Sequence, residues 1–372
     1  MPAARGQLWE SFLTQLESHL AAGDVATATS WLESYRGKES GEPWPEVLRL
    51  AQARWQEVSG QEAVAEVTYR ELIKVAQMPK IRERSRQALQ GILAREQQAR
   101  QQAIATAMGA ADAGQVGFLV VQPVGAIPRE DLARRVARFF QTDVLTAKTW
   151  LPVRHPRILR LGSLGELRVY RDWFRAEGIG AGCVTPEAIA AVPVFAVDFF
   201  ALVSPTQVQA VGPTGALVFD VGQVVRRVEG TVPVFSKVMA FDAQRRLTHK
   251  DQVLDRVRVC EVHLPDRVLR FHDNGYQFER GVVLTAAGAT TVQARWQALM
   301  DWWEVLTPGK RYPGDFTAFG EMALGYGSFL RERVQPRLDL RGSVQSGALP
   351  LNTRQWDVCF EVFSALAFGE AP

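Results

Sequence analysis

Six arginines between residues 154 and 175 are the side chains of this sequence best spaced for recognition. The last three are three and four residues apart, so a helix would place them on one face, and the first three fall in a segment that we expect to be a loop. Such a group could bind an acidic protein surface, anionic lipid head groups or RNA. The alternative is a solvated face that carboxylates elsewhere in the chain balance. The residues are Arg154, Arg157, Arg160, Arg168, Arg171 and Arg175.

Residue types that carry out catalysis or bind metals lack the spacing of a known site. His263 and His272 flank an expected turn next to Asp273, and two histidines with a carboxylate could hold a metal, yet the spacing matches no metal signature. Ordinary strand histidines are the alternative. The cysteines are too far apart to share a metal ion, and we expect reduced thiols. They are Cys183, Cys260 and Cys359.

No motif of a nucleotide, zinc or serine-hydrolase site is present. The glycines at 178, 180 and 182 follow a helical pattern and precede a strand, which is the reverse of the dinucleotide fingerprint. The sequences GxxxxGK[ST], HExxH and GxSxG do not occur. We therefore predict no catalytic residue, cofactor or metal. An enzyme whose site converges from scattered residues is the alternative, with a pocket where the β-rich part meets the C-terminal aromatic helices.

The composition is that of a globular chain with one basic segment. The 372 residues are 47% apolar and 22% charged, with a net charge of +3. Residues 116–184 carry 11 basic and 6 acidic side chains, whereas 1–115 and 185–372 are each nearly balanced. The start of the chain lacks the apolar core of a secretory signal, and Pro193 and Asp198 interrupt the longest apolar run. We expect a cytoplasmic protein with no transmembrane segment, and attachment to a membrane surface as the alternative.

Residues 1–113 show a helical pattern with a faint repeat. Gly23 and Ala28 recur as Gly60 and Ala65, which is an offset of 37 residues. Glycine helps the chain turn between two helices, and small residues let antiparallel helices approach closely. The segment resembles tetratricopeptide-type helical hairpins, which implies a face for a partner helix or peptide. Trp44 is the tryptophan that we assign to partner binding, and helices that merely pack on the rest of the chain are the alternative.

Residues 116–184 predict a β–α–α–α–β order. An apolar strand precedes a helix that Pro128 opens, and the Ala176–Gly178 turn ends the last helix before a closing strand. With Ala147-Lys148 in the second helix and Pro156 six residues before Gly162, this segment resembles the C-terminal domain of ribosomal protein L7/L12 and the ClpS-type adaptors. The ribosomal domain is acidic and this segment is basic, so translation-factor binding is not carried over.

Residues 185–306 predict a β-rich part, and 307–372 predict helices. Short strands separated by turn residues, followed by a helix over 292–306, look like a pleckstrin-homology-type (PH-like) barrel closed by one helix. Asn274-Gly275 predicts a type I′ hairpin. Helices over 316–333 and 355–367 carry aromatic stripes, which are typical of a core.

Taken together, these patterns predict an α+β multi-domain protein. It would combine helical hairpins, an L7/L12-like α/β module, a PH-like barrel and C-terminal helices, and act as a non-catalytic adaptor, scaffold or assembly factor. RNA or an anionic membrane bound at the arginines is the alternative, and an enzyme with an unrecognised pocket is a further one. The arginine bias, the Gln-rich helices and the tryptophan count resemble those of cyanobacterial proteins, which would suggest a photosynthetic complex as partner.

Overall fold

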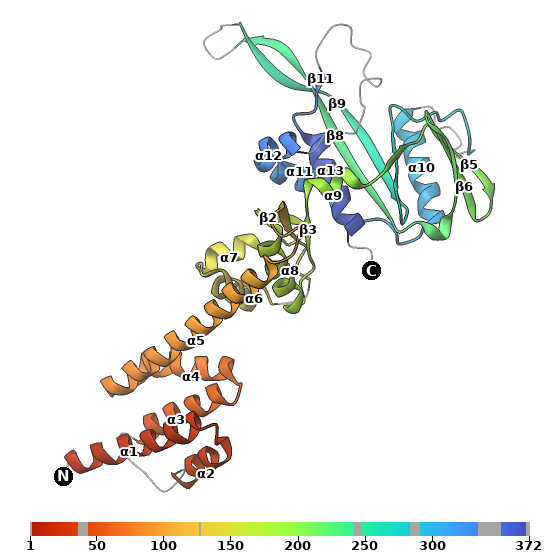
Figure 1. The fold of residues 1–372 in the computed structure, drawn as a ribbon. Coiled ribbons are helices and arrows are strands. Elements are labelled where there is room, and N and C mark those ends of the chain that lie inside the picture. The colour runs from red at the N-terminus through yellow and green to blue at the C-terminus, as the bar shows by residue number, and fades with distance from the viewer. Residues whose placement is uncertain are drawn as a thin grey trace. The chain divides into compact units, whose positions relative to one another are not determined.

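The fold is α+β, with helices first, several small sheets next and helices again at the end (Figure 1). The computed structural model describes residues 2–35, 44–125, 128–241, 247–282, 291–333 and 351–369. Contacts divide the chain into two compact units, Met1–Ala105 and Thr106–Pro372. The predicted α+β class is therefore confirmed, while the division into four named domains stays a prediction. Within the described ranges no helix is long and apolar enough to cross a membrane.

The first unit consists of helices, and tight turns join α1 to α2 and α3 to α4. The helices α1 and α2 pack together, as do α3 and α4, and α3 contacts both α1 and α2. Gly23 and Gly60 turn the chain between the helices of each pair with φ of 75° and 82°, a backbone region that favours glycine. The helices are α1 (Pro2–Ala21), α2 (Val25–Tyr35), α3 (Trp44–Val58), α4 (Glu62–Val75) and α5 (Pro79–Ala107).

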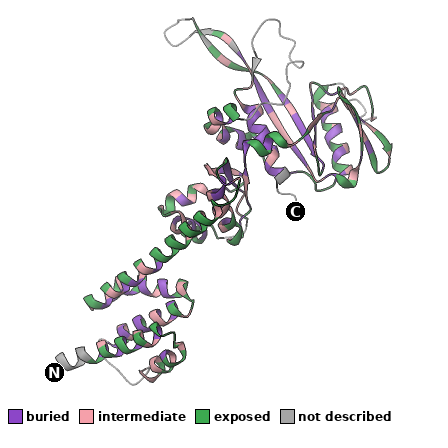
Figure 2. Ribbon diagram, in the orientation of Figure 1, coloured by how far each residue is buried: buried purple, intermediate pink, exposed green. Residues whose placement is uncertain are grey.

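The 37-residue offset has a structural counterpart in the core of this unit. Ala28 and Ala65 are both 0% exposed, each five residues after its turn glycine. The first half of α5 covers this core with Ile81, Ala88 and Ile92 on one face. From residue 93 to 99 every side chain of α5 is exposed (Figure 2), so no apolar packing supports that stretch.

The second unit begins with a three-stranded antiparallel sheet and three helices. Its strand order is β2-β1-β3, with β1 in the centre. The strand β2 corrects the sequence interpretation, because residues 157–163 are not a loop: they pair with β1, although the pairing shifts between Leu119 and Val120. The elements are β1 (Val116–Val121), α6 (Arg129–Phe140), α7 (Val144–Trp150), β2 (Arg157–Ser163), α8 (Leu164–Ala176) and β3 (Ala181–Val184).

The β-rich part forms open sheets, so the predicted PH-like barrel is wrong: no closed barrel occurs among the described strands. One sheet has the order β11-β8-β9-β10-β4, and the other is the meander β5-β6-β7. The residues after Asn274-Gly275 form no strand, so the predicted hairpin is also wrong. The elements are α9 (Pro186–Ala191), β4 (Val194–Ala196), β5 (Phe199–Ser204), β6 (Gln207–Gly212), β7 (Gly215–Asp220), a 3₁₀ turn (Val221–Gln223), β8 (Arg226–Phe241), β9 (Leu247–His263), β10 (Val268–His272) and α10 (Val292–Leu306).

The last helix lies at the centre of the second unit. It is buried on nearly all sides, as expected for a helix that is apolar all round. It contacts β3, β8 and α9, and its aromatic residues share one core with Phe118 and Val120 of β1. The remaining elements are α11 (Phe316–Ala323), a 3₁₀ turn (Leu324–Tyr326), α12 (Gly327–Arg333), β11 (Leu351–Asn352) and α13 (Trp356–Gly369).

The turn glycine Gly60 gives a test of the helical repeat. We expect Gly60→Ala to destabilise the first unit by about 1–2 kcal/mol, because a side chain strains this left-handed backbone. Gly91→Ala is the matched control: this glycine is helical with room for a methyl group, so we expect a gain of about 0.5–1 kcal/mol. Hydrogen exchange of the amides of α3 and α4 measures the stability of both variants. Equal changes in the two variants would contradict a left-handed turn at Gly60.

Candidate functional site

Five buried polar side chains converge where β9, β10 and α13 meet. Glu261 and His263 are two residues apart on β9 and therefore share a face of the strand. Glu361 and Ser364 are three apart on α13 and share a face of the helix. Arg270 of β10 lies directly opposite Glu261 in the sheet. All five are at most 5% exposed, so their charges and hydrogen bonds are satisfied within the protein or not at all.

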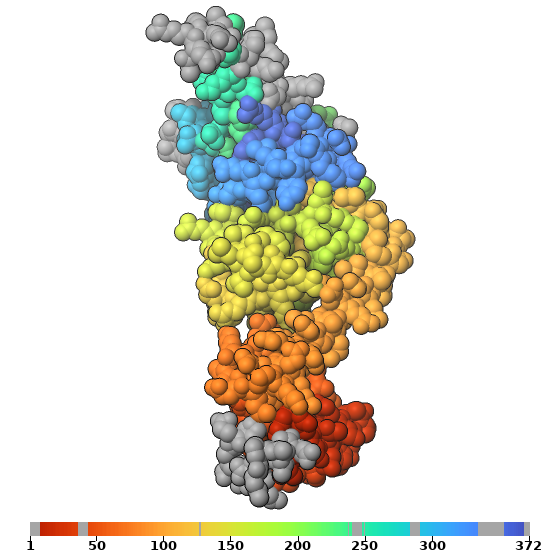
Figure 3. Space-filling model, turned by 90° about the vertical axis from the view of Figure 1, so that its left-hand side faces the viewer, coloured from red at the N-terminus to blue at the C-terminus, as the bar shows by residue number. Residues whose placement is uncertain are grey.

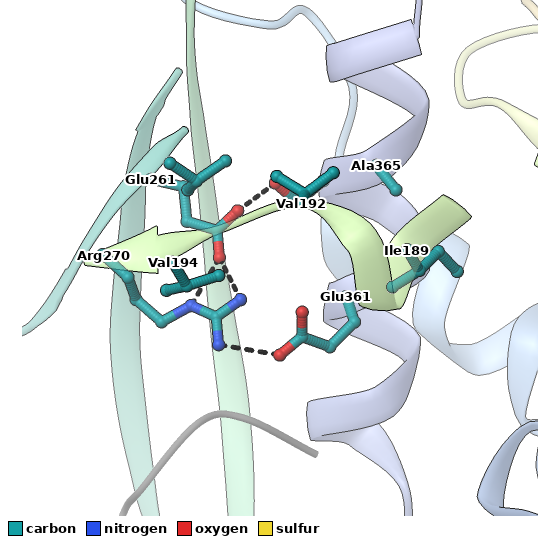
Figure 4. Close-up of a pocket in the computed structure, with 9 residues that line it drawn as sticks. Ile189, Val192, Val194, Glu261, Arg270, Glu361 and Ala365 are labelled. Atoms are coloured by element: carbon teal, nitrogen blue, oxygen red, sulfur yellow. Dashed lines mark hydrogen bonds and ion pairs between the residues drawn. The ribbon is translucent and has the colours of Figure 1, made fainter. Parts of the chain in front are cut away.

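Arg270 lies between two carboxylates (Figure 4). Its Nη1 donates to Glu361 Oε1 at 2.7 Å, and its Nε donates to Glu261 Oε1. A second nitrogen of the guanidinium, Nη2, meets the same Glu261 oxygen, so two donors of the arginine converge on Oε1. The arginine thus connects β9 to α13 through one desolvated cation.

Ser364, His263 and Glu261 resemble a hydrolase relay in composition but not in geometry. His263 Nε2 lies 2.8 Å from Ser364 Oγ and 3.5 Å from Glu261 Oε2, and the serine hydroxyl donates to that same carboxylate. In a catalytic triad the serine and the carboxylate occupy opposite nitrogens of the imidazole. Here both meet Nε2, and the serine proton already goes to the carboxylate. The arrangement cannot activate the hydroxyl as a nucleophile in that way.

The charges of the cluster stabilise one another. Burial alone would raise the pKa of Glu261, but the Arg270 charge and the hydrogen bonds from His263 and Ser364 lower it below its ordinary 4.5. The two carboxylates in turn raise the pKa of Arg270, against the effect of its burial. Glu261 and Arg270 are therefore both ionised in the folded protein at neutral pH.

A small pocket opens beside this cluster. Its volume is about 240 Å³ with the solvent at its mouth included, and Figure 4 shows Glu261 and Arg270 on the strands and Glu361 on the helix among the residues that line it. The other walls are aliphatic, from Ile189, Val192 and neighbouring residues. The pocket lies at the predicted junction of the β-rich part and the C-terminal helices. Its guanidinium, however, is already bonded to carboxylates of the chain, which leaves little for a substrate to replace.

Comparison with models of protein families, with curated proteins and with solved structures finds no match. The function is therefore argued from the chain's own side chains. The resemblances to tetratricopeptide hairpins, to the L7/L12 and ClpS fold and to cyanobacterial proteins stay predictions.

The three predicted arginines that lie on α8 are all engaged within the protein. Arg168 makes two hydrogen bonds of 2.7 and 2.6 Å to the carboxylate of Asp112, which lies in the turn after α5. Arg171 pairs with its neighbour Asp172 at 2.8 Å. Arg175 donates through Nε to the carbonyl of Ala181, although its side chain remains exposed. This face of α8 thus contributes to packing as well as to the surface charge.

The other three predicted arginines lie outside α8, in β2 and in the residues before it. The guanidinium of Arg160 lies 5.2 Å from the ring centre of Tyr170, which is two residues from Arg168 and so about 200° around the helix. Arg157 donates to the carbonyl of Thr149 at the end of α7. Arg154 is exposed and pairs with no residue that the structure describes. The six arginines therefore do not form a single face.

The remaining predicted residues lie in cores or apart from one another. Trp44 is 5% exposed and packs against Phe12 and Tyr35 inside the first unit. His263 is opposite Val268 in the sheet whereas His272 is opposite Val259, so the structure does not bring the two histidines together. No group of three or more His, Cys, Asp or Glu side chains in the described ranges is placed to hold a metal ion.

The structure shows a surface that the sequence interpretation missed, which we call the aromatic–basic face. Phe139 and Trp173 stack at 4.3 Å between ring centres, with 14° between their planes, although both remain half-exposed. The rings come from α6, α7 and α8. Arg160 lies over the ring of Tyr170, and the half-exposed side chains of Arg135 and Arg160 form ion pairs with Glu177 and Glu166. The pairs Phe139-Phe140 and Trp173-Phe174 were the available signal. The aromatic members are Phe139, Phe140, Trp150 and Trp173, and Tyr170, which is only 6% exposed, packs against Phe139 and Phe140 from inside the module.

Removal of the buried cation tests the role of the cluster. We expect Arg270→Met to lower the free energy of unfolding by about 3–5 kcal/mol, because it leaves two carboxylates buried without a counter-charge. In the Glu261→Gln/Glu361→Gln background the same replacement should cost far less. Urea unfolding at neutral pH measures all four proteins, and equal costs in the two backgrounds would show that the ion pairs do not matter.

The lowered pKa of Glu261 predicts an acid-dependent loss of stability. The unfolded chain binds this proton more tightly than the folded chain does, so the stabilisation is complete above about 4.5 and is lost as pH falls through the lower folded pKa. Glu261→Gln should therefore flatten the decline of stability below that pH. Exposed Glu321→Gln serves as the control. If Glu261→Gln lost stability with falling pH as steeply as the wild type does, the lowered pKa of Glu261 would not be the cause.

Proposed function

We propose that this chain is a non-catalytic interaction protein that binds an acidic partner protein through the aromatic–basic face. The observation that supports the proposal is the stack of half-exposed rings on α6–α8, in the segment with the largest basic excess of the chain. Half-exposed aromatic and arginine side chains are the groups that most often dominate the energy of protein interfaces. The proposal retains the adaptor function and moves its site from the six-arginine face to this neighbouring surface.

The apolar side chains of α7 extend the proposed contact. Leu145 is 75% exposed and Val144 is exposed next to it, at the start of the helix whose Trp150 packs on Phe140. Figure 3 shows this part of the chain, in yellow, at the surface that faces the viewer. Exposed aliphatic groups on a helix that also carries one of the rings favour a partner that brings apolar side chains of its own.

Charge favours an acidic partner over a neutral one. Residues 116–184 hold 11 basic and 6 acidic groups, so several cations remain after all local pairs are formed. Arg154, Arg160 and Arg175 are exposed, and such charges speed association with an acidic surface and suppress basic competitors. The partner chemistry is thus an acidic protein segment that also carries apolar residues.

RNA and anionic membranes fit the same charge less well. Nucleobases stack on free aromatic faces, whereas Phe139 and Trp173 stack on each other and each lose one face to the other. An interfacial membrane helix needs a long apolar stripe, but α7 has only 7 residues. Both ligands therefore enter as alternative outcomes of the test.

The test compares binding to an amphipathic peptide with a Glu-rich polar face and to its Lys-rich counterpart. We expect the acidic peptide to bind the full chain, and Leu145→Asp to weaken it by about tenfold, or about 1.4 kcal/mol. Val305→Asp is the matched control, since Val305 of α10 is 80% exposed and lies outside the face. Fluorescence anisotropy at physiological salt gives the dissociation constants.

Three results would overturn this function. The Lys-rich peptide could bind as well as the Glu-rich one, the two Asp variants could weaken binding equally, or only single-stranded RNA or anionic vesicles could bind. The last result would support the electrostatic alternative, provided that the affinity falls steeply with salt.

A further inference from the structure

The meander β5-β6-β7 is almost free of charge. Residues 199–220 contain a single charged side chain, Asp220, at the end of β7. One face of the sheet is buried: Phe200, Val208 and Phe219 belong to a core closed by α10, and Phe200 and Phe219 contact the indole ring of Trp303. Packing of this buried face attaches the sheet to the core, but it does not explain why the opposite face and the edge strand β7 carry so few charged residues.

The opposite face of the meander is apolar and open. The strand register places Ala201, Gln209 and Val218 in one cross-strand row, on the side away from the buried residues. Val218 is 48% exposed and Val203 is 54% exposed. A solvent-facing sheet surface ordinarily carries charged or polar groups, whereas this row offers only a glutamine. At the start of β5, on the same side of the sheet, the guanidinium of Arg280 lies 4.3 Å from the ring centre of Phe199.

The outer edge of β7 is open among the residues that the structure describes. Its inner edge pairs with β6 without a bulge, from Gly215 opposite Gly212 to Asp220 opposite Gln207. No strand in the described ranges pairs with its outer edge. Alternate residues of an antiparallel strand point their N–H and C=O groups away from the neighbour, so half of the backbone polar groups of β7 face outward. Natural edge strands carry lysine, proline or a bulge against unwanted pairing, and β7 has none of these.

The other edge of the meander shows the contrast. The backbone of β5 and of the residue before it is bonded by a following segment, since Val282 N donates to Phe200 O and Gln277 N donates to Asp198 O, both at 2.8 Å. The chain thus protects one edge of this small sheet with its own backbone. Among the residues that the structure describes, it leaves the other edge open.

We propose that β7 pairs antiparallel with β7 of a second copy of this chain. Pairing across a twofold axis would join the two meanders into one continuous six-stranded sheet and satisfy the outward backbone groups of both strands. The charges favour a second copy as the occupant. The strand offers no charge to select an acidic or basic partner, and a full overlap of the six residues places each Asp220 opposite Gly215 of the other copy, away from its like charge.

The test measures the oligomeric state of the full chain and of an edge variant. We expect a reversible dimer by sedimentation equilibrium up to about 100 μM, a concentration at which micromolar affinity is saturated. Ala216→Lys/Val218→Lys should weaken dimerisation by more than about tenfold, because it places cations on the outer face of both edge strands. Val203→Lys on β5 is the matched control, with the same change on an equally exposed valine of the same sheet.

Hydrogen exchange locates the interface independently of the variants. Amides of residues 215–220 should exchange more slowly at high than at low protein concentration, while circular dichroism confirms that the lysine variants remain folded. A wild-type chain that is monomeric throughout overturns the proposal. So does an edge variant that dimerises like the wild type, or a control that dissociates to the same extent, since the contact would then lie elsewhere.

Discussion

The second unit depends on one desolvated cation, the guanidinium of Arg270 between Glu261 and Glu361. Apolar packing holds α13 in the core, but such packing has no direction and would accept several rotations of a helix that is apolar all round. An arginine that meets two carboxylates accepts far fewer, because its donors form a rigid fork. The ion pairs therefore fix which side of α13 faces β9, and with it the side that faces the rest of the unit.

The position of α13 determines which surfaces the α/β module can offer. Phe118 and Val120 of the central strand belong to the same core as Phe360 and Phe363 of α13, although some 240 residues separate them in the chain. One face of the β2-β1-β3 sheet is therefore closed by the C-terminal helices. The residues of α6, α7 and α8 do not belong to that core, so the aromatic–basic face that these helices carry is not covered by it.

Local patterns predicted the helices well and the strands less well. The spacing of apolar residues predicted most ends of α8 and α13 to within one or two residues. A helix forms its hydrogen bonds within one segment, so its periodicity can be recognised in the local sequence. The segment with the arginines at 157 and 160 was interpreted as a loop, so the strand β2 was missed. Its pairing with β1 joins residues some 40 positions apart, which no local pattern reveals. The predicted barrel was wrong for a related reason. The lengths of strands and turns do not determine whether the first and last strands of a sheet pair and close it.

The polar sites show the same division between local and distant information. Arg168, Arg171 and Arg175 share a helix face as their spacing requires, but the partner that engages Arg168 is Asp112, in a turn that no periodicity connects to α8. Glu261 and Arg270 are nine residues apart and could be matched across a hairpin, whereas Glu361 and Ser364 reach them from a helix about 100 residues later. A surplus of charge can therefore be located from the sequence to within a segment. Whether a given arginine is available to a partner depends on the distant residue that the fold places beside it.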